Sequence, residues 1–167
     1  MAKPLSTRAY LSLGSNLGDR ARNIATAISS LREIGEVAAM SSLYETEPVE
    51  FTDQPWFLNS AVALDTKASP AELMADILAI EEKMGRRRLV KKGPRVIDID
   101  ILFFGDQVVE SSSLLIPHPS IAERRFVLEP LAEIAPDAVH PVSGKTVRQL
   151  RDALPAGQQV RRVAIEQ

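Results

Sequence analysis

The sequence predicts an α+β fold, a single compact domain in which helices pack on a mixed or antiparallel β-sheet. A chain of 167 residues falls within the usual size of one domain. Segments with apolar residues at helical spacing alternate with short apolar runs that suit strands. Two strand candidates, 37–44 and 59–64, follow each other without a helix between them, which favours a mixed sheet over a purely parallel one. No linker or internal repeat is evident, so residues 1–167 are expected to form one domain.

The first part of the chain is expected to contain three strands and one helix. Residues 9–13 suit a short strand, and a polar turn after them leads into a helix whose apolar residues recur at helical spacing until Gly35. A second strand is expected at 37–44 and a third at 59–64. Between them, the prolines and polar residues of 45–55 indicate a long loop, and long loops are often functional.

The second part opens with a strong helix start. Residues 69–72, Ser-Pro-Ala-Glu, combine a capping box with proline at the first helical position, and Gly85 ends this helix. Residues 96–104 are the most strand-like run of the sequence, so we expect a central strand there. Shorter strands at 108–109 and 114–116, helices near 123–133 and 147–154, and a last strand at 160–165 complete the expected order.

The composition narrows the function classes. Apolar residues make up 45% of the chain and charged residues 25%, a balance typical of globular proteins. No apolar run approaches the ~20 residues that cross a bilayer, and the N-terminus has no secretory pattern, so a cytoplasmic location is expected. The absence of cysteine excludes disulfides and thiolate chemistry, and two histidines make a multi-histidine metal site improbable. A net charge of −2 gives no general reason to bind nucleic acid.

An acidic pair inside the 96–104 strand is the sharpest local feature. Strand side chains alternate, so Asp98 and Asp100 project from one face while Ile99 points to the other. Two crowded carboxylates on a buried strand repel each other unless cations compensate, and Mg²⁺ favours carboxylate oxygens together with water and phosphates. Taken alone, the pair fits equally well as edge-strand aspartates that form salt bridges with arginines.

A basic run precedes the acidic pair. Its members are Arg86, Arg87, Arg88, Lys91, Lys92 and Arg95. Arginine forks match phosphate oxygens and stabilise the charge that develops during phosphoryl transfer. Alone, such a run is more often a solvated loop. Beside a metal-binding carboxylate pair, polyphosphate binding becomes the favoured interpretation.

Neither glycine-containing turn of the chain is a P-loop. Residues 14–18, Gly-Ser-Asn-Leu-Gly, follow a strand but do not match G-x-x-x-x-G-K-[ST]. Residues 144–146, Gly-Lys-Thr, have the end of that motif, but Val139 stands where its first glycine is needed. We therefore interpret the first turn as a tight strand-to-helix connection.

Three residues are candidates for holding a flat heterocycle. Phe57 and Phe126 can stack on a ring, and the Asn59 amide offers both a donor and an acceptor to its edge. Each alone is more often a core or turn residue. His118, between two prolines, is compatible with a proton carrier, a phosphate donor or a plain loop residue.

Taken together, these segments resemble the 6-hydroxymethyl-7,8-dihydropterin pyrophosphokinase family of folate biosynthesis. The resemblance covers nearly the whole chain in the family's order. The matching segments are 10–18, 42–48, 53–59, 93–105, 116–119 and 124–128. The run from Gly93-Pro94-Arg95 to Asp98-Ile99-Asp100 is the most specific of them.

The resemblance implies a ferredoxin-like α+β fold and transfer of diphosphate from ATP to the hydroxymethyl group of the pterin, with AMP leaving. It implies two Mg²⁺ ions on Asp98 and Asp100, and a monomeric protein. Net charge and hydropathy, as described above, predict no nucleic-acid or membrane partner. The implied catalytic residues are Arg86 and Arg95. The implied pterin-binding residues are Thr46, Val49, Phe57, Asn59 and Phe126. The implied ATP-binding residues are Glu81, Arg88, Ile101, His118 and Arg124.

Some positions depart from the family's pattern. Lys92 stands in place of a tryptophan and Ser113 in place of an arginine, and the loop between Arg88 and Gly93 is one residue shorter. Two other functions stay open at this point. One is a different Mg²⁺-dependent phosphotransferase or nuclease with the same acidic pair, and the other is a binding module without turnover.

Overall fold

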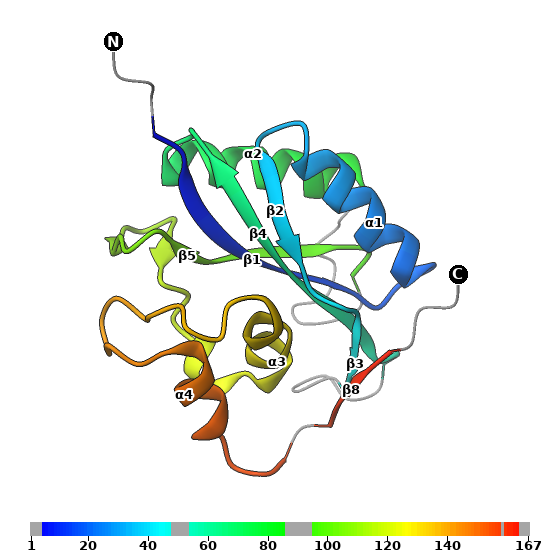
Figure 1. Ribbon diagram of the computed structural model, residues 1–167. Coiled ribbons are helices and arrows are strands. Elements are labelled where there is room, and N and C mark those ends of the chain that lie inside the picture. Colours follow the sequence, from blue (N-terminus) through cyan, green and yellow to red (C-terminus); the bar gives the residue numbers. More distant parts are fainter. Residues whose placement is uncertain (1–4, 48–53, 86–94, 158, 164–167) are drawn as a thin grey trace.

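The computed structural model describes residues 5–47, 54–85, 95–157 and 159–163 (Figure 1). Within these ranges the main sheet has six strands, and all of their pairings are antiparallel. They are β1 (Thr7–Ser15), β2 (Glu36–Met40), β3 (Tyr44–Thr46), β4 (Phe57–Thr66), β5 (Asp98–Phe104) and β8 (Val160–Arg162). The strand order is β5-β1-β4-β3-β8, and β2 also pairs with β4. The antiparallel form of the expected α+β fold is confirmed.

Four helices cover the two faces of this sheet in the described part of the chain. They are α1 (Arg20–Leu31), α2 (Pro70–Lys83), α3 (Arg125–Ile134) and α4 (Val147–Asp152). A short 3₁₀ helix (Ile121–Glu123) and a two-stranded sheet of β6 (Val109–Glu110) and β7 (Leu115–Ile116) complete the elements. Helices α1 and α2 pack on one face, and α3 and α4 on the other (Figure 1). None of these helices is long and apolar enough to cross a membrane.

Each face of the sheet has its own hydrophobic core. Leu11 and Leu13 of β1 point toward α1 and α2, where they pack with Ile24 and Ile77. Tyr10, the residue before Leu11, lies in the second core with α3. The alternation of strand side chains therefore divides the sheet into an α1/α2 face and an α3/α4 face, and the candidate site lies on the second.

The expected capping box opens α2. The Ser69 hydroxyl accepts a hydrogen bond from the Glu72 N–H at 3.1 Å, and the Glu72 carboxylate accepts one from the Ser69 N–H at 2.9 Å. Gly85 follows the helix with a φ of 85°, a conformation that favours glycine. The first helix, by contrast, ends at Leu31, several residues before the expected stop at Gly35.

The predicted strand at 37–44 is split into β2 and β3, and each of these strands pairs with β4. Ser41 sits at the break. Its N–H donates to the Ala61 carbonyl at 2.8 Å, and its hydroxyl accepts from the Ala61 N–H at 2.8 Å. The Ser41 hydroxyl thus replaces a main-chain carbonyl as the acceptor of the Ala61 N–H. The strand is therefore interrupted at Ser41, while β2 and β3 both stay paired with β4.

The prediction that 96–104 forms a central strand was wrong. Among the described residues β5 pairs only with β1. Its outer edge is covered by other groups, because the Glu81 carboxylate accepts from the Ile99 N–H at 2.8 Å and the His118 N–H donates to the Leu102 carbonyl at 3.0 Å. Both faces of β5 are buried by the two cores, which gives an edge strand the continuous apolar pattern of a central one.

Candidate active site

A row of directly paired residues crosses four neighbouring strands on the α3/α4 face. Asp98 of β5 pairs with Gly14 of β1, Gly14 pairs with Asn59 of β4, and Asn59 pairs with Tyr44 of β3. Tyr44 contacts Glu133 of α3, which identifies the face. Residues paired across strands project to the same side. The register therefore brings the predicted acidic and heterocycle-binding positions together on one surface.

Gly14 makes room for the Asn59 side chain. A Cβ atom at Gly14 would lie 2.7 Å from the Asn59 Oδ1 atom. The Asn59 side chain is buried, and its Nδ2 donates to the Thr46 hydroxyl at 2.5 Å. Phe57 lies two residues before Asn59 on β4 and pairs with Thr46. Three predicted pterin-binding residues, Thr46, Phe57 and Asn59, thus form one group on β3 and β4.

Phe126, the fourth described pterin-binding candidate, lies in the first turn of α3 and is half-buried. The guanidinium carbon of Arg124 is 5.6 Å from the centre of its ring, within the range of a cation–π contact. A residue predicted for ATP and one predicted for the pterin are therefore neighbours. Val49, Arg86 and Arg88 lie outside the described residues.

Asp98 and Asp100 share the face that the sequence predicted. Asp98 accepts a hydrogen bond from Arg95 Nη1 at 3.0 Å. Burial, followed by the charge of Asp98, raises the pKa of Asp100 above its ordinary value, and the charges of Arg124 and Arg95 counter this only in part. The negative charge at Asp100 is thus incompletely compensated by side chains, which suits a divalent cation.

The residues at the pair fit Mg²⁺. This ion is usually held by one or two carboxylates, with water and substrate phosphates completing the coordination. No group of three or more His, Cys, Asp and Glu side chains that could hold a metal occurs in the described residues, so an all-protein cage is not what they form. The ion pair between Arg95 and Asp98 also matches the salt-bridged edge strand that the sequence left open.

Glu81 and His118 flank β5 on its outer edge. The Glu81 side chain is 4% exposed, and it binds the N–H of Ile99, the residue between the two aspartates. The His118 Nδ1 atom accepts from the Ser120 N–H at 3.1 Å, which leaves Nε2 as the donor of the neutral ring. Burial and the charge of Arg124 lower the pKa of His118 to about 4, so the ring is neutral at pH 7.

A cavity of about 270 Å³ lies beside Asp100. It is lined by Asp100 and by Ile101 and His118, and the last two were predicted to bind ATP. The rest of its wall is formed by Met74, Ile99, Ser112, Ser113, Leu114, Leu115 and Pro119. Ser113, which departs from the family's pattern, is therefore in place to affect what this cavity holds.

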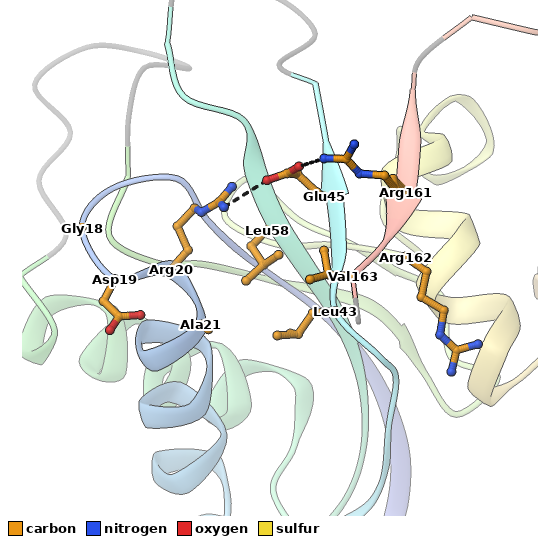
Figure 2. A pocket seen from close by; sticks show the side chains of 10 residues that line it. All are labelled: Gly18, Asp19, Arg20, Ala21, Leu43, Glu45, Leu58, Arg161, Arg162 and Val163. Atoms are coloured by element: carbon orange, nitrogen blue, oxygen red, sulfur yellow. Dashed lines mark hydrogen bonds and ion pairs between the residues drawn. The ribbon is translucent and has the colours of Figure 1, made fainter. Parts of the chain in front are cut away.

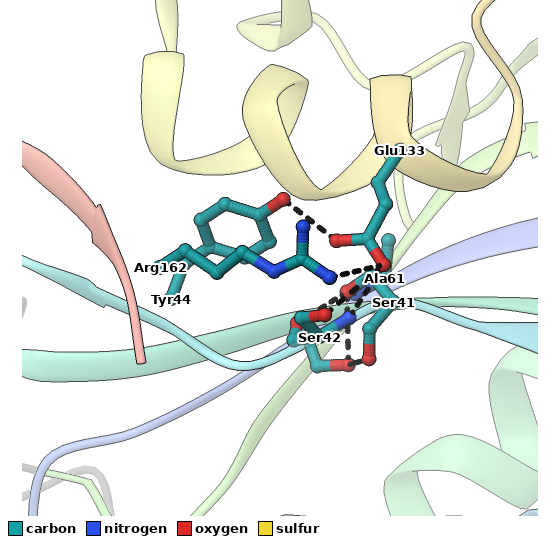
Figure 3. A network of polar contacts seen from close by, with 7 residues as sticks. Ser41, Ser42, Tyr44, Ala61, Glu133 and Arg162 are labelled. Carbon is teal, nitrogen blue, oxygen red and sulfur yellow. Dashed lines mark hydrogen bonds and ion pairs between the residues drawn. The ribbon is translucent and has the colours of Figure 1, made fainter. Parts of the chain in front are cut away.

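Sequence reasoning missed a polar network between β3 and α3 (Figure 3). The Glu133 carboxylate accepts hydrogen bonds from the Tyr44 hydroxyl at 2.7 Å and from the Ser42 N–H at 3.0 Å, and Arg162 of β8 lies 3.9 Å from it. Burial and the Glu133 contact raise the pKa of Tyr44 to about 12. A glutamate in an apolar helix gave no sequence signal, because its partners Ser42 and Tyr44 lie about ninety residues earlier.

A second, larger cavity of about 650 Å³ opens on the α1/α2 face (Figure 2). Glu45 lies between Arg20 and Arg161 and accepts hydrogen bonds from both. Burial raises the pKa of Glu45, but the two arginines outweigh it and hold the pKa below its ordinary value. Since Glu45 and Thr46 point to opposite faces of β3, the sheet separates this cavity from the candidate site.

The fold and the site define an α+β protein with a metal-compatible carboxylate pair and a ring-binding group on one face of its sheet. The chain belongs to the 7,8-dihydro-6-hydroxymethylpterin-pyrophosphokinase (HPPK) family, whose model matches residues 10–136. This confirms the family that the sequence motifs indicated.

Relatives of known name agree with the family. The chain is 50% identical over 145 residues to the 2-amino-4-hydroxy-6-hydroxymethyldihydropteridine pyrophosphokinase of Methylorubrum extorquens, covering 86% of this chain and 90% of that protein. It is 45% identical over 150 residues to the folic acid synthesis protein fol1 of Schizosaccharomyces pombe, covering 89% of this chain and 20% of that protein. The chain thus spans about a fifth of the length of fol1 and nearly all of the bacterial enzyme.

Solved structures support the fold. The crystal structure of Plasmodium falciparum HPPK-DHPS with pteroate superposes with a TM-score of 0.72 at 21% identity, covering 91% of this chain and 43% of that one. At this identity the likeness shows the fold alone. It agrees with the α+β, ferredoxin-like arrangement that the resemblance implied.

Proposed function

We propose that this chain transfers diphosphate from ATP to 6-hydroxymethyl-7,8-dihydropterin and so produces AMP and the pterin diphosphate of folate biosynthesis. Membership of the family supports the reaction. The observation that carries it in the structure is the row from Asp98 through Gly14 to Asn59, because it sets a phosphate-side group and a pterin-side group on one face. Residues 1–167 would act as one pyrophosphokinase domain.

The pterin would lie over β3 and β4. The Asn59 amide can pair with the polar edge of the ring, and Gly14 leaves the space in which this amide lies. Phe57 and Phe126 would contact the faces of the ring, with Thr46 and Val49 completing the pocket. Burial of Asn59 and its bond to Thr46 hold the amide in one orientation before the substrate arrives.

We assign Asp98 and Asp100 as the residues that hold two Mg²⁺ ions. When bound, these ions would neutralise the phosphates of ATP and lower the pKa of the attacking hydroxyl. The carboxylates project from one face of β5, and the elevated pKa of Asp100 reflects a site that favours a cation. The buried Glu81 carboxylate binds the strand between them and so keeps the two aspartates in register.

The nucleotide would occupy the cavity beside Asp100. Ile101 offers an apolar wall, and the neutral His118 ring offers its Nε2 proton to an oxygen acceptor. Arg124 supplies positive charge near the pair. Arg88 and Glu81 are the remaining ATP-side residues. Arg88 would bind a phosphate of ATP, and Glu81 would act from its buried position, where it binds the Ile99 N–H.

Catalysis would rest mainly on alignment and charge. The pterin hydroxyl oxygen attacks the β-phosphorus, the bond from this phosphorus to the oxygen of the α-phosphate breaks, and AMP leaves with that oxygen. Arg95, 3.0 Å from Asp98, stands beside the acidic pair and would stabilise the charge that develops on the transferred group, together with Arg86. No described side chain is required as a base, so the hydroxyl proton would pass to solvent.

Product analysis tests the proposal. Purified protein with ATP, Mg²⁺ and 6-hydroxymethyl-7,8-dihydropterin should form AMP and a diphosphorylated pterin, and neither should form when pterin or Mg²⁺ is omitted. ADP as the product would point to another phosphotransferase. Tight ATP binding without turnover would favour a binding module. The monomeric state, the cytoplasmic location and the absence of nucleic-acid and membrane partners stay predictions.

A further inference from the structure

The turn after β1 has a role that its glycines alone do not explain. It is the Gly-Ser-Asn-Leu-Gly segment that does not form a P-loop, and its central residue, Asn16, is 1% exposed. A buried amide needs hydrogen-bond partners for one oxygen and two N–H groups. Among the described residues, the hydrogen-bond partners of the Asn16 side chain all belong to segments that lead into the candidate active site.

Asn16 holds the main chain of Arg95 from both sides. Its Oδ1 atom accepts from the Arg95 N–H at 2.7 Å, and its own N–H donates to the Arg95 carbonyl at 3.0 Å. The two residues are 79 positions apart in sequence. This two-point contact fixes both the position and the direction of the main chain from which the Arg95 guanidinium reaches Asp98.

The other half of the same amide holds the segment that enters β4. Asn16 Nδ2 donates to the Pro55 carbonyl at 3.0 Å and to the Gln54 Oε1 atom at 2.8 Å. Pro55 is two residues before Phe57 and four before Asn59, the ring-binding candidates of β4. A single planar group thus binds the phosphate side through its oxygen and the pterin side through its nitrogen.

We propose that Asn16 is a positioning residue that sets the separation between the Arg95 guanidinium and the pterin pocket. The proposal rests on the proposed function, since it needs both substrates on this face. Only a side chain with an acceptor and a two-proton donor at this reach can make these contacts together. Aspartate keeps the acceptor and loses the donors, while alanine loses both.

Three variants test the proposal, with Arg95 amide exchange and steady-state kinetics as readouts. Asn16→Ala should expose the Arg95 N–H to hydrogen exchange and lower kcat by about 30-fold or more, because small displacements of catalytic groups are costly. Asn16→Asp should raise KM for the pterin about fivefold, the effect of about one hydrogen bond, and keep kcat within about threefold of wild type. Asn23→Ala is the matched control.

The control, from the first turn of α1, breaks two side-chain hydrogen bonds to the same turn, whereas Asn16→Ala breaks three. Asn23 Nδ2 donates to the Ser15 hydroxyl at 3.2 Å and to the Leu17 carbonyl at 2.8 Å, but it contacts neither Arg95 nor Pro55 in these bonds. Asn23→Ala should leave the hydrogen-exchange protection of the Arg95 N–H unchanged. It should also keep kcat within about twofold of wild type. Equal loss of activity in Asn16→Ala and Asn23→Ala would overturn the proposal, because the turn would then matter only for general stability.

A double mutant separates positioning from a general structural effect. If Asn16 acts through Arg95, Asn16→Ala should change kcat less than about threefold in an Arg95→Ala background. The same fold-loss in both backgrounds would overturn the proposal. If Asn16→Ala does not fold, Asn16→Asp is the remaining test, and an unchanged KM for the pterin in this variant would contradict the proposal. If the wild-type protein forms no pterin-dependent AMP, the proposed function is wrong. Hydrogen exchange of the Arg95 N–H would still report whether Asn16 holds the main chain of Arg95.

Discussion

The Glu133 carboxylate of α3 binds the Tyr44 hydroxyl of β3 at a distance of 2.7 Å. The same carboxylate binds the main chain of Ser42, so one helix residue fixes the short strand that carries Thr46 (Figure 3). This contact joins two parts of the proposed pterin pocket, because α3 also carries Phe126. The stability of the pocket therefore depends on a residue that lies outside it.

Removing this carboxylate should destabilise the protein. Glu133→Ala leaves the hydroxyl of the buried Tyr44 side chain and the Ser42 N–H without this partner, so we expect a loss of about 2 kcal/mol in the free energy of unfolding. Urea denaturation at pH 7 measures it. Glu129→Ala, one turn earlier on α3, removes an ion pair with Arg125 and should cost less than about 1 kcal/mol.

The stabilisation by Glu133 should depend on pH. Hydrogen bonds from Tyr44 and Ser42 outweigh the effect of burial and hold the pKa of Glu133 below its ordinary value of 4.5. A group whose pKa is lower in the folded protein stabilises fully above its unfolded pKa, and this contribution is lost as pH falls through the folded pKa. The stability difference between wild type and Glu133→Gln should therefore shrink as pH falls below about 4.5. A difference that is constant from pH 7 to pH 3 would contradict this.

The acidic pair should trade stability for activity. Asp98→Asn and Asp100→Asn should each lower turnover by about a thousandfold or more, because the Mg²⁺ ions proposed to bind the ATP phosphates would lose a carboxylate ligand. Without Mg²⁺ at pH 8, Asp100→Asn should be as stable as wild type or more stable, since burial and Asp98 disfavour the ionised Asp100 side chain. The rate of AMP formation measures turnover, and thermal unfolding with and without Mg²⁺ and ATP measures stability. A fully active double variant would refute the metal assignment.

Gly14 should be required for the pterin side. In Gly14→Ala the new methyl group meets the Asn59 Oδ1 atom at 2.7 Å, so the amide must move out of its place. We expect KM for the pterin to rise by about tenfold or more, with a smaller change in ATP affinity. Gly157→Ala is the control, because a Cβ at Gly157 meets no atom within 4 Å. Similar pterin KM values for the two variants would argue against the assigned role of Asn59.

Arg95 should act on the transition state more than on binding. Arg95→Ala removes the guanidinium beside Asp98, and we expect kcat to fall by about a hundredfold while the dissociation constant of ATP changes by less than about fivefold. Single-turnover kinetics and equilibrium titration separate the two quantities. An unchanged kcat would remove Arg95 from the catalytic assignment.

The sequence predicted what depends on local pattern. Strand alternation placed Asp98 and Asp100 on one face, and the Ser69 capping box set the start of α2 where it is observed. The edge position of β5 could not be predicted, because burial by two cores gives edge and central strands the same apolar pattern. The partners of Asn16 were also out of reach, since the contact with Arg95 spans 79 positions and has no periodic signal.

The groups on the outer edge of β5 have a consequence for self-association. An unpaired strand edge is a template on which another chain can add a strand. Here the Ile99 N–H is already bound to the Glu81 side chain and the Leu102 carbonyl to the His118 N–H, and an incoming strand would have to displace the buried Glu81 side chain to pair there. Glu81 is thus expected to act as a gatekeeper against aggregation, keeping the strand of the acidic pair open to small ligands and closed to other chains.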